Sequence, residues 1–173
     1  MFDLLIQGGT VVDGTGAPAK QADVAITGGR IVEVGPQLSG QAKRTLDASG
    51  HLVTPGFVDI HTHYDGQVTW DPVLAPSSIH GVTSLVMGNC GVGFAPARPS
   101  DHAFLISMLE GVEDIPGTAL TEGLTWDWET FTDYLDALGR RHYAVDVATQ
   151  VAHAPLRAYV MGERGADPNE APT

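Results

Sequence analysis

The segment of residues 55–65 constrains the fold of this 173-residue chain more than any other part of its sequence. Phe57, Val58 and Ile60 supply the bulky side chains that favour a β-strand. A Pro-Gly pair in front of them marks where the strand begins. We therefore predict a strand over residues 56–62.

The polar residues of this segment carry its chemistry. Side chains alternate between the two faces of a strand, so Asp59, His61 and His63 are expected to point in the same direction. Two imidazoles one step apart on one face, at the end of a strand, can reach a single metal ion. His-x-His pairs also arise by chance in surface loops, so the pair alone leaves a metal site and an ordinary surface feature both open.

The composition limits the partners that the chain can have. It is 43% apolar, as in globular proteins that bury a core. Nine basic residues against 21 acidic ones give a net charge of −12, which argues against nucleic acid and anionic membrane surfaces. The sequence has no apolar run long enough for a transmembrane helix and no signal-peptide pattern. A single cysteine cannot form an internal disulfide, so we expect the cytoplasm as the compartment.

Residues 1–54 are predicted to form part of a small antiparallel sheet. Short apolar runs separated by glycine-rich turns indicate strands at residues 4–6, 10–12, 23–26 and 30–34. Gly8-Gly9 is expected to separate the first two strands. Asp13-Gly14 and Gly28-Gly29 suit turns that need positive φ.

From residue 55 onward the pattern changes to alternating strands and helices. Near-continuous hydrophobicity predicts further buried strands at 82–87 and 143–152. Helices are expected near 76–80, after a Ser100 cap with Phe104, Leu105, Met108 and Leu109 on one side, and from about Asp127 to Leu138. The alternation predicts an α/β fold with a parallel sheet or barrel. The acidic segment 110–123 is expected to be a loop, and the tail 162–173 to fray.

Further polar residues lie at the predicted strand ends, where parallel sheets and barrels place their sites. Cys90 closes the second strand within a Gly-Asn-Cys-Gly sequence, and His153 closes the third. Thiolate and imidazole are both zinc ligands. A lone cysteine also suits a small buried apolar residue, and His153 suits a packing role. The acidic group Glu110, Glu113 and Asp114 is interpreted as a solvated loop face.

Several of these segments resemble a known family. Residues 55–63 look like the first-strand signature of the amidohydrolase superfamily. Residues 86–96, which contain Asn89-Cys90-Gly91, closely resemble the second-strand motif of the N-acyl-D-amino-acid deacylases (D-aminoacylases), and residues 109–116 and 156–162 are similar to segments of that family. The resemblance covers essentially the whole chain.

The resemblance implies the start of a metal-dependent (β/α)₈ TIM-like barrel. Residues 55–173 would supply its first three β/α units, and residues 1–54 the N-terminal part of a small β-sandwich domain. By motif, His61 and His63 match the family's first-strand metal ligands and Cys90 matches its cysteine ligand. The roles of His153 and Arg157 stay open.

The resemblance also implies an activity. The family uses zinc, here one or two ions, to hydrolyse the amide of N-acyl-D-amino acids to a carboxylate and a D-amino acid. Its later histidine ligands and its general base match no residue of this chain, so no catalytic residue is assigned. A full barrel takes roughly 250 residues. The expected partners are therefore the small-molecule substrate and the remainder of the same polypeptide, and the 173-residue chain alone is expected to be inactive.

Two alternatives stay open. One is another amide or cyclic-amide hydrolase of the superfamily, such as a dihydropyrimidinase-like enzyme, and Cys90 counts against it. The other is a non-catalytic metal-binding fragment with an incomplete site.

Overall fold

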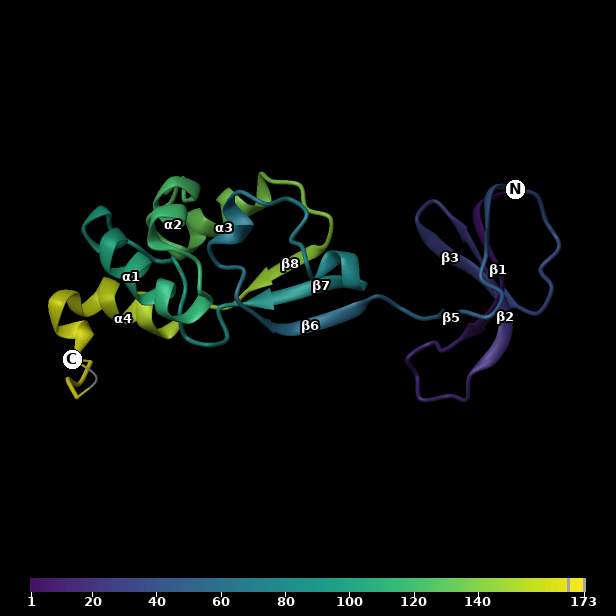
Figure 1. Cartoon of the computed structure of the whole chain (residues 1–173), viewed down its shortest axis with the longest axis horizontal. Helices are drawn as coiled ribbons and strands as arrows, with labels where there is room; N and C mark the ends of the chain where they lie inside the picture. Colours follow the sequence, from purple (N-terminus) through teal and green to yellow (C-terminus); the bar gives the residue numbers. More distant parts are fainter. Residues whose placement is uncertain (168, 173) are drawn as a thin grey trace. The chain divides into compact units, whose positions relative to one another are not determined.

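The computed structural model describes residues 1–167 and 169–172 of the chain. Its internal contacts divide it into two compact units, Met1–Pro55 and the part from Gly56 onward. Each unit has its own sheet, and within the described residues the two sheets share no strand (Figure 1).

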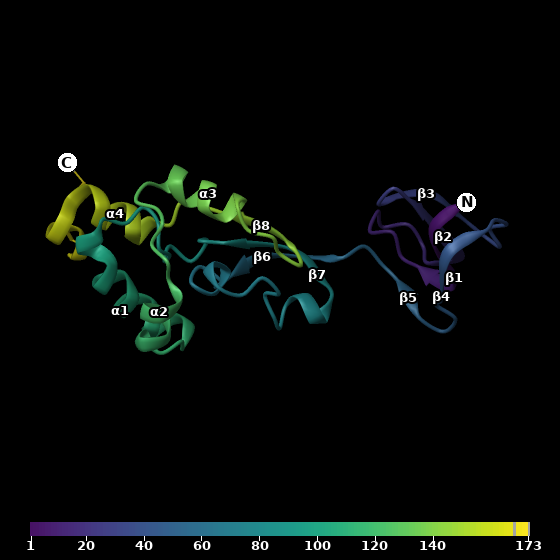
Figure 2. The ribbon, with the colours of Figure 1, turned by 90° about the horizontal axis from the view of Figure 1, so that it is seen from above.

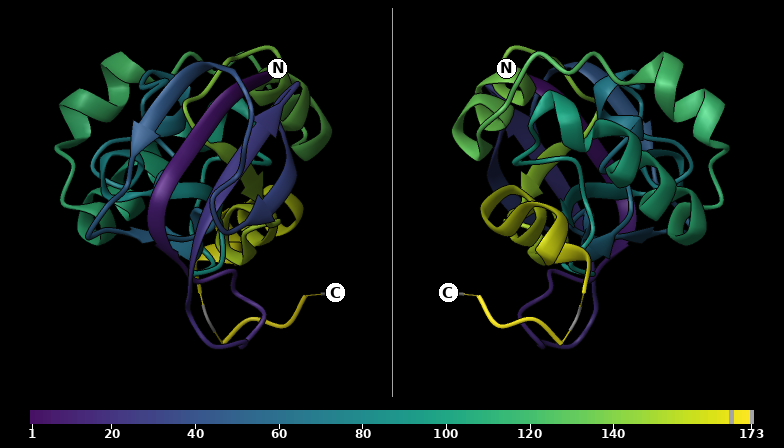
Figure 3. Two further views of the ribbon diagram at one scale, coloured as in Figure 1. Left: turned by 90° about the vertical axis from the view of Figure 1, so that its right-hand side faces the viewer. Right: turned by 90° about the vertical axis from the view of Figure 1, so that its left-hand side faces the viewer.

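The first unit is a sheet built around one long strand, β1. Its elements are β1 (Phe2–Val11), β2 (Lys20–Thr27), β3 (Arg30–Gly35), β4 (Ala42–Asp47) and β5 (Leu52–Val53). The strand β2 runs antiparallel to both β1 and β3, whereas β4 and β5 run parallel to β1. The twist of these strands is visible in the left view of Figure 3. The sheet is therefore mixed, and the prediction of an antiparallel sheet is wrong. The prediction missed β4, because this polar strand lacks the apolar pattern that located the other strands.

The Gly8-Gly9 pair interrupts β1 without ending it. The pairing of β1 with β2 shifts register between Ile6 and Gly9, and Gly8 has a φ of +70°. The predicted break is thus a bulge within one strand. The backbone N–H of Gly8 donates a 2.8 Å hydrogen bond to the carboxylate of buried Asp23, which holds the bulge in the sheet.

The second unit contains three parallel strands in the order β6-β7-β8. They are β6 (Phe57–Thr62), β7 (Val82–Met87) and β8 (Asp146–Thr149). The predicted α/β class is confirmed at this level. The third strand is shorter than the predicted 143–152, because the chain leaves the sheet after Gln150, whose N–H bonds to the carbonyl of Met87.

Helices flank this sheet and follow its strands. The α-helices of the described residues are α1 (His102–Glu113), α2 (Gly117–Gly123), α3 (Phe131–Gly139) and α4 (His153–Met161). Short 3-10 segments are η1 (Gln67–Thr69), η2 (Ser78–His80), η3 (Pro99–Asp101) and η4 (Gly162–Ala166). In Figure 2, α3 lies on one side of the sheet and the connection with η1 and η2 on the other. Across the described chain, no helix is long and apolar enough to cross a membrane.

The segment 110–123 is not the loop that was predicted. It holds the last turn of α1 and all of α2. The helical conformation ends at Asp114, which has a φ of +54°, and a new helix begins after Pro116. Leu120 then anchors α2 because it is fully buried. Ser100 is also not the cap of α1, since it lies inside η3.

The helix α3 begins later than predicted. Residues 127–130 stay outside it because Trp128 is buried and its indole N–H donates a 2.8 Å hydrogen bond to the carbonyl of Phe94. Thr130 then caps the helix. Its hydroxyl accepts the N–H of Asp133, and the Asp133 carboxylate accepts the N–H of Thr130, which is a capping box.

Residues 162–167 are held in place by helical structure and hydrogen bonds, contrary to what their composition suggested. Residues 162–166 form η4 directly after α4, as the right view of Figure 3 shows. Arg157 on α4 donates to the carbonyl oxygens of Gly165 (3.0 Å) and Asp167 (2.7 Å). The predicted fraying therefore fails for residues 162–167, and Pro168 and Thr173 lie outside the described residues.

The helix α1 packs one of its faces into the core of the second unit. The fully buried side chains of that core include Phe94, Leu74, Leu85, Met87, Leu105, Leu109, Leu120 and Tyr134. Leu105 and Leu109, four residues apart on α1, share the face that packs inward. Phe104 on the same helix is 42% exposed.

This difference predicts unequal effects of truncation. Leu109→Ala should lower the free energy of unfolding by about 2–5 kcal/mol, because it leaves a cavity in a close-packed core. Phe104→Ala should cost less than half as much, since part of that ring already contacts water. Chemical denaturation of both variants measures the difference. Equal losses would contradict the assignment of the buried face.

Candidate metal centre

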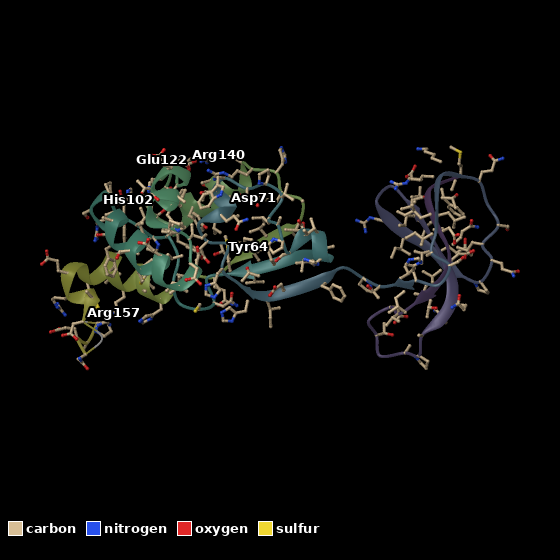
Figure 4. The ribbon with its side chains drawn as sticks, viewed as in Figure 1. Tyr64, Asp71, His102, Glu122, Arg140 and Arg157 are labelled. Atoms are coloured by element: carbon tan, nitrogen blue, oxygen red, sulfur yellow. The ribbon has the colours of Figure 1, made fainter. Side chains whose placement is uncertain are left out.

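The three predicted metal ligands come together at the carboxyl ends of β6 and β7. His61, His63 and Cys90 each offer one ligand atom, and these atoms lie within 4.8 Å of one another. The rings of His61 and His63 are stacked, with centroids 5.6 Å apart and an interplanar angle of 16°. Tyr64, labelled in Figure 4, marks this end of the sheet. The convergence is observed, whereas the ligand role of these residues stays a prediction.

The chemistry of this cluster fits a metal ion. Imidazole nitrogen and thiolate sulfur are ligands that zinc prefers. Nδ1 of His63 is buried and has no hydrogen-bond partner among the described residues. A buried polar atom without a partner is costly, and an ion or a further polar group would remove that cost. Cys90 is an exposed free thiol, so an ion can approach it.

Two glycines give the Cys90 turn its shape. Gly88 and Gly91 have φ values of +82° and +85°, a region that other residues rarely adopt. A Cβ on Gly88 would lie 2.5 Å from the carbonyl oxygen of Gln150. The carbonyl of Gly91 also accepts the N–H of Ala154. The turn is therefore held against β8 and the start of α4, with Cys90 at its tip.

The strand β6 is not as regular as the alternation rule assumed. Asp59 pairs with Leu85 and Thr62 with Met87, with a register shift between the two pairs. The regular pairing that this expectation assumed is interrupted between Asp59 and Thr62, although the rings of His61 and His63 still stack. The Asp59 carboxylate accepts the backbone N–H of His61 at 3.2 Å. Asp59 therefore contacts the local backbone of the strand.

His153 lies elsewhere in the local structure than predicted. It is the first residue of α4 instead of the end of a strand, and its side chain is exposed. Among the described residues it is not part of the ligand cluster. Its role therefore stays open. Another histidine, His102, stacks on Trp126 with ring centroids 3.6 Å apart, which is a packing role.

A buried carboxyl group near the histidines escaped the sequence analysis. Asp65, two residues after His63, is only 4% exposed. Burial raises the pKa of its carboxyl to about 7, although a backbone hydrogen bond from Gly88 opposes the shift. A Cβ on Gly93 would lie 3.0 Å from Oδ1 of Asp65, so this glycine leaves room for the carboxyl.

Glu113 is a second buried acid, and its predicted place on a solvated loop face is wrong. It ends α1, and both carboxylate oxygens are buried without a hydrogen-bond partner among the described residues. Burial, and then the charge of Asp65, raise the pKa of Glu113 to about 8. Its spacing of four from Leu109 puts it on the buried helical face. That signal was missed because the helix was ended too early.

Comparison with known proteins identifies relatives of this arrangement. The model of the amidohydrolase family matches residues 44–172. The chain is 38% identical over 160 residues to D-aminoacylase from Alcaligenes xylosoxydans, covering 92% of this chain and 31% of that protein. It is 39% identical to N-acyl-D-glutamate deacylase from the same organism, covering 97% of this chain and 32% of that protein.

The fold of this chain is also similar to a solved structure. N-acyl-D-glutamate deacylase from Bordetella bronchiseptica, complexed with zinc and a phosphonate mimic of the tetrahedral intermediate, superposes with a TM-score of 0.77 at 36% identity. The match covers 99% of this chain and 33% of that structure. The chain thus spans about a third of the length of the relatives it matches.

The buried position of Glu113 predicts a pH-dependent stability. A carboxyl whose pKa rises from 4.5 to about 8 on folding stabilises the fold below pH 4.5 and loses that contribution as the pH rises to about 8. Glu113→Gln should therefore raise the free energy of unfolding at pH 8, by up to about 5 kcal/mol at 1.4 kcal/mol per pKa unit. The gain should vanish near pH 4.5.

Denaturation of both proteins across this pH range measures the effect. Glu122→Gln is the matched control, because Glu122 is exposed on α2 (Figure 4) and its substitution should leave the profile of the parent protein unchanged. Identical pH profiles for the parent and Glu113→Gln would show that the carboxyl is hydrated.

Proposed function

The chain belongs to the amidohydrolase family, and we propose that, with the remainder of its polypeptide, it catalyses the zinc-dependent hydrolysis of N-acyl-D-amino acids. One observation carries the proposal: Cys90 lies in a single cluster with His61 and His63, in a chain that matches D-aminoacylases over nearly its whole length. The products would be a carboxylate and a free D-amino acid.

We propose that residues 55–173 form the first three β/α units of a (β/α)₈ barrel. Phe57, Val58 and Ile60 on β6 support this, because they are 59%, 62% and 69% exposed. Apolar side chains exposed together usually mark a surface that another segment covers. Among the described residues β6 pairs only with β7, and in a barrel its other edge would pair with a later strand.

A similar exposure supports the proposal that residues 1–54 are part of a small β-sandwich domain. On β3, Ile31, Val32 and Val34 are 66%, 53% and 41% exposed. A second sheet packed on the first would cover them, as in sandwich domains.

We assign His61, His63 and Cys90 as ligands of one or two zinc ions. Zinc bound there would polarise the scissile carbonyl and make a water molecule more acidic. The stacked imidazoles present nitrogen donors from one strand end, and the Gly88–Gly91 turn presents the thiolate opposite them. The residue that moves the proton to the leaving amine is assigned to the remainder of the polypeptide.

The substrate class follows from the relatives. They carry the names D-aminoacylase and N-acyl-D-glutamate deacylase, so the shared chemistry is an amide between an acyl group and a D-amino acid. The cysteine ligand disfavours a dihydropyrimidinase-like activity. The exposed free thiol of Cys90 fits a reducing compartment, and we propose the cytoplasm.

The ligand assignment predicts the metal content of a Cys90→Ala variant. Removal of the thiolate should abolish tightly held zinc in the full-length protein, because Cys90 is the anionic ligand among the three that this chain supplies. Elemental analysis after dialysis against a weak chelator measures the zinc per protein. His153→Ala should keep the parent stoichiometry, and an unchanged zinc content in Cys90→Ala would refute the ligand role.

The fold assignment predicts where activity resides. The 173-residue chain should not hydrolyse N-acetyl-D-amino acids even with added zinc, since three strands cannot close a barrel around a dry site. The full-length protein should release free D-amino acid from neutral or acidic N-acetyl substrates, and the L-isomers serve as controls. Turnover by the short chain that matches the longer one and is lost in Cys90→Ala would overturn the fragment argument.

A further inference from the structure

We propose that Asn89 is a positioning residue of the metal centre, which fixes His61 relative to Cys90 by holding the irregular stretch of β6. The inference rests on the proposed function, because it takes His61, His63 and Cys90 as the residues that bind zinc. It adds a residue that contacts no metal and acts through the backbone of the strand.

The backbone of β6 departs from regular pairing next to its first histidine. Asp59 pairs with Leu85 and Thr62 with Met87, so three steps along β6 correspond to two along β7. Ile60 and His61 occupy the extra length. An irregular stretch of this kind redirects side chains and loses part of the regular ladder. The position of His61 therefore depends on bonds other than those of the sheet.

Asn89 supplies such a bond. Its Nδ2 donates a 2.6 Å hydrogen bond to the carbonyl oxygen of Ile60. Ile60 directly precedes His61, and Asn89 directly precedes Cys90. One hydrogen bond thus ties the backbone beside a histidine to the side chain of the residue beside the cysteine. The hydroxyl of Thr62 makes a second tie, donating to the carbonyl of Val86 at 3.1 Å.

Within the described part of the chain, the oxygen of the Asn89 amide makes no hydrogen bond that could orient the side chain, so the bond to Ile60 does so. Oδ1 of Asn89 is buried and has no hydrogen-bond partner among the described residues. The amide orientation is therefore set by the N–H side alone. Gly88 fixes the backbone from which the side chain projects, because its positive φ and its closeness to Gln150 leave little freedom. The donor is thus aimed from a rigid turn at a carbonyl in an irregular strand.

Substitution of Asn89 tests the proposal on the full-length protein. Asn89→Asp keeps the shape but loses the N–H donor, and Asn89→Ala loses both. Tyr143→Phe is the matched control, because it removes a 3.0 Å hydrogen bond from a partly buried side chain to the carbonyl of Val68 in the same unit. Three quantities are measured: Co²⁺ affinity by chelator competition, the thiolate-to-cobalt charge-transfer absorption, and the unfolding midpoint without metal.

The expected result separates positioning from general stability. Both Asn89 variants should bind Co²⁺ about 10–100-fold more weakly, the usual effect of losing a residue that orients metal ligands, and their charge-transfer band should shift or weaken. Tyr143→Phe should lower the metal-free unfolding midpoint about as much as the Asn89 variants do. It should keep the Co²⁺ affinity and the absorption spectrum of the parent protein.

Other results would overturn the proposal. Asn89→Ala with the affinity and spectrum of the parent would do so, and so would an equal loss of affinity in Tyr143→Phe. A parent protein whose Co²⁺ binding does not depend on Cys90 would leave Asn89 with no centre to position. Asn89-dependent Co²⁺ binding in a protein that hydrolyses no N-acyl-D-amino acid would support the inference while contradicting the proposed function.

Discussion

The site depends on the way the carboxyl ends of β6 and β7 are held side by side. The histidines lie at the end of β6 and just after it, and the cysteine lies in the turn after β7, so the pairing of these two strands brings the residues to the same edge of the sheet. Thr62 and Asn89 each reach across this pair to a backbone carbonyl. Gly88 lets the second strand turn against β8, where a larger residue would collide with Gln150. A metal ion placed here would therefore bind to a frame that already exists.

The same frame carries a cost in buried charge. Asp65 and Glu113 lie in the interior of the second unit, and burial raises the pKa of each carboxyl. A buried carboxyl group costs stability when it ionises, and the charge of Asp65 adds to the effect of burial on Glu113. Asp65 lies two residues after His63 in the sequence, so this cost falls close to the site.

Much of this arrangement could be predicted from local patterns. Apolar β-forming runs located β6 and β7, and motif likeness singled out His61, His63 and Cys90, which the structure brings together. Local patterns failed where tertiary contacts decide. The strand β4 is polar and takes its structure from pairing with β1, and Trp128 delays α3 by bonding to Phe94. The irregularity between Asp59 and Thr62 likewise arises from strand pairing that no short window contains. The burial of Glu113 had a local signal in its spacing from Leu109, but only for a helix that continues past residue 110.

The central claim is that the thiolate of Cys90, His61 of β6 and His63 just after β6 share a metal centre. X-ray absorption at the zinc edge of the zinc-loaded full-length protein tests it most directly, because sulfur and nitrogen scatterers are distinguishable. The account predicts a sulfur scatterer near ~2.3 Å together with nitrogen scatterers near ~2.0 Å, and loss of the sulfur contribution in Cys90→Ala. A first coordination sphere made only of nitrogen and oxygen in the parent protein would contradict it.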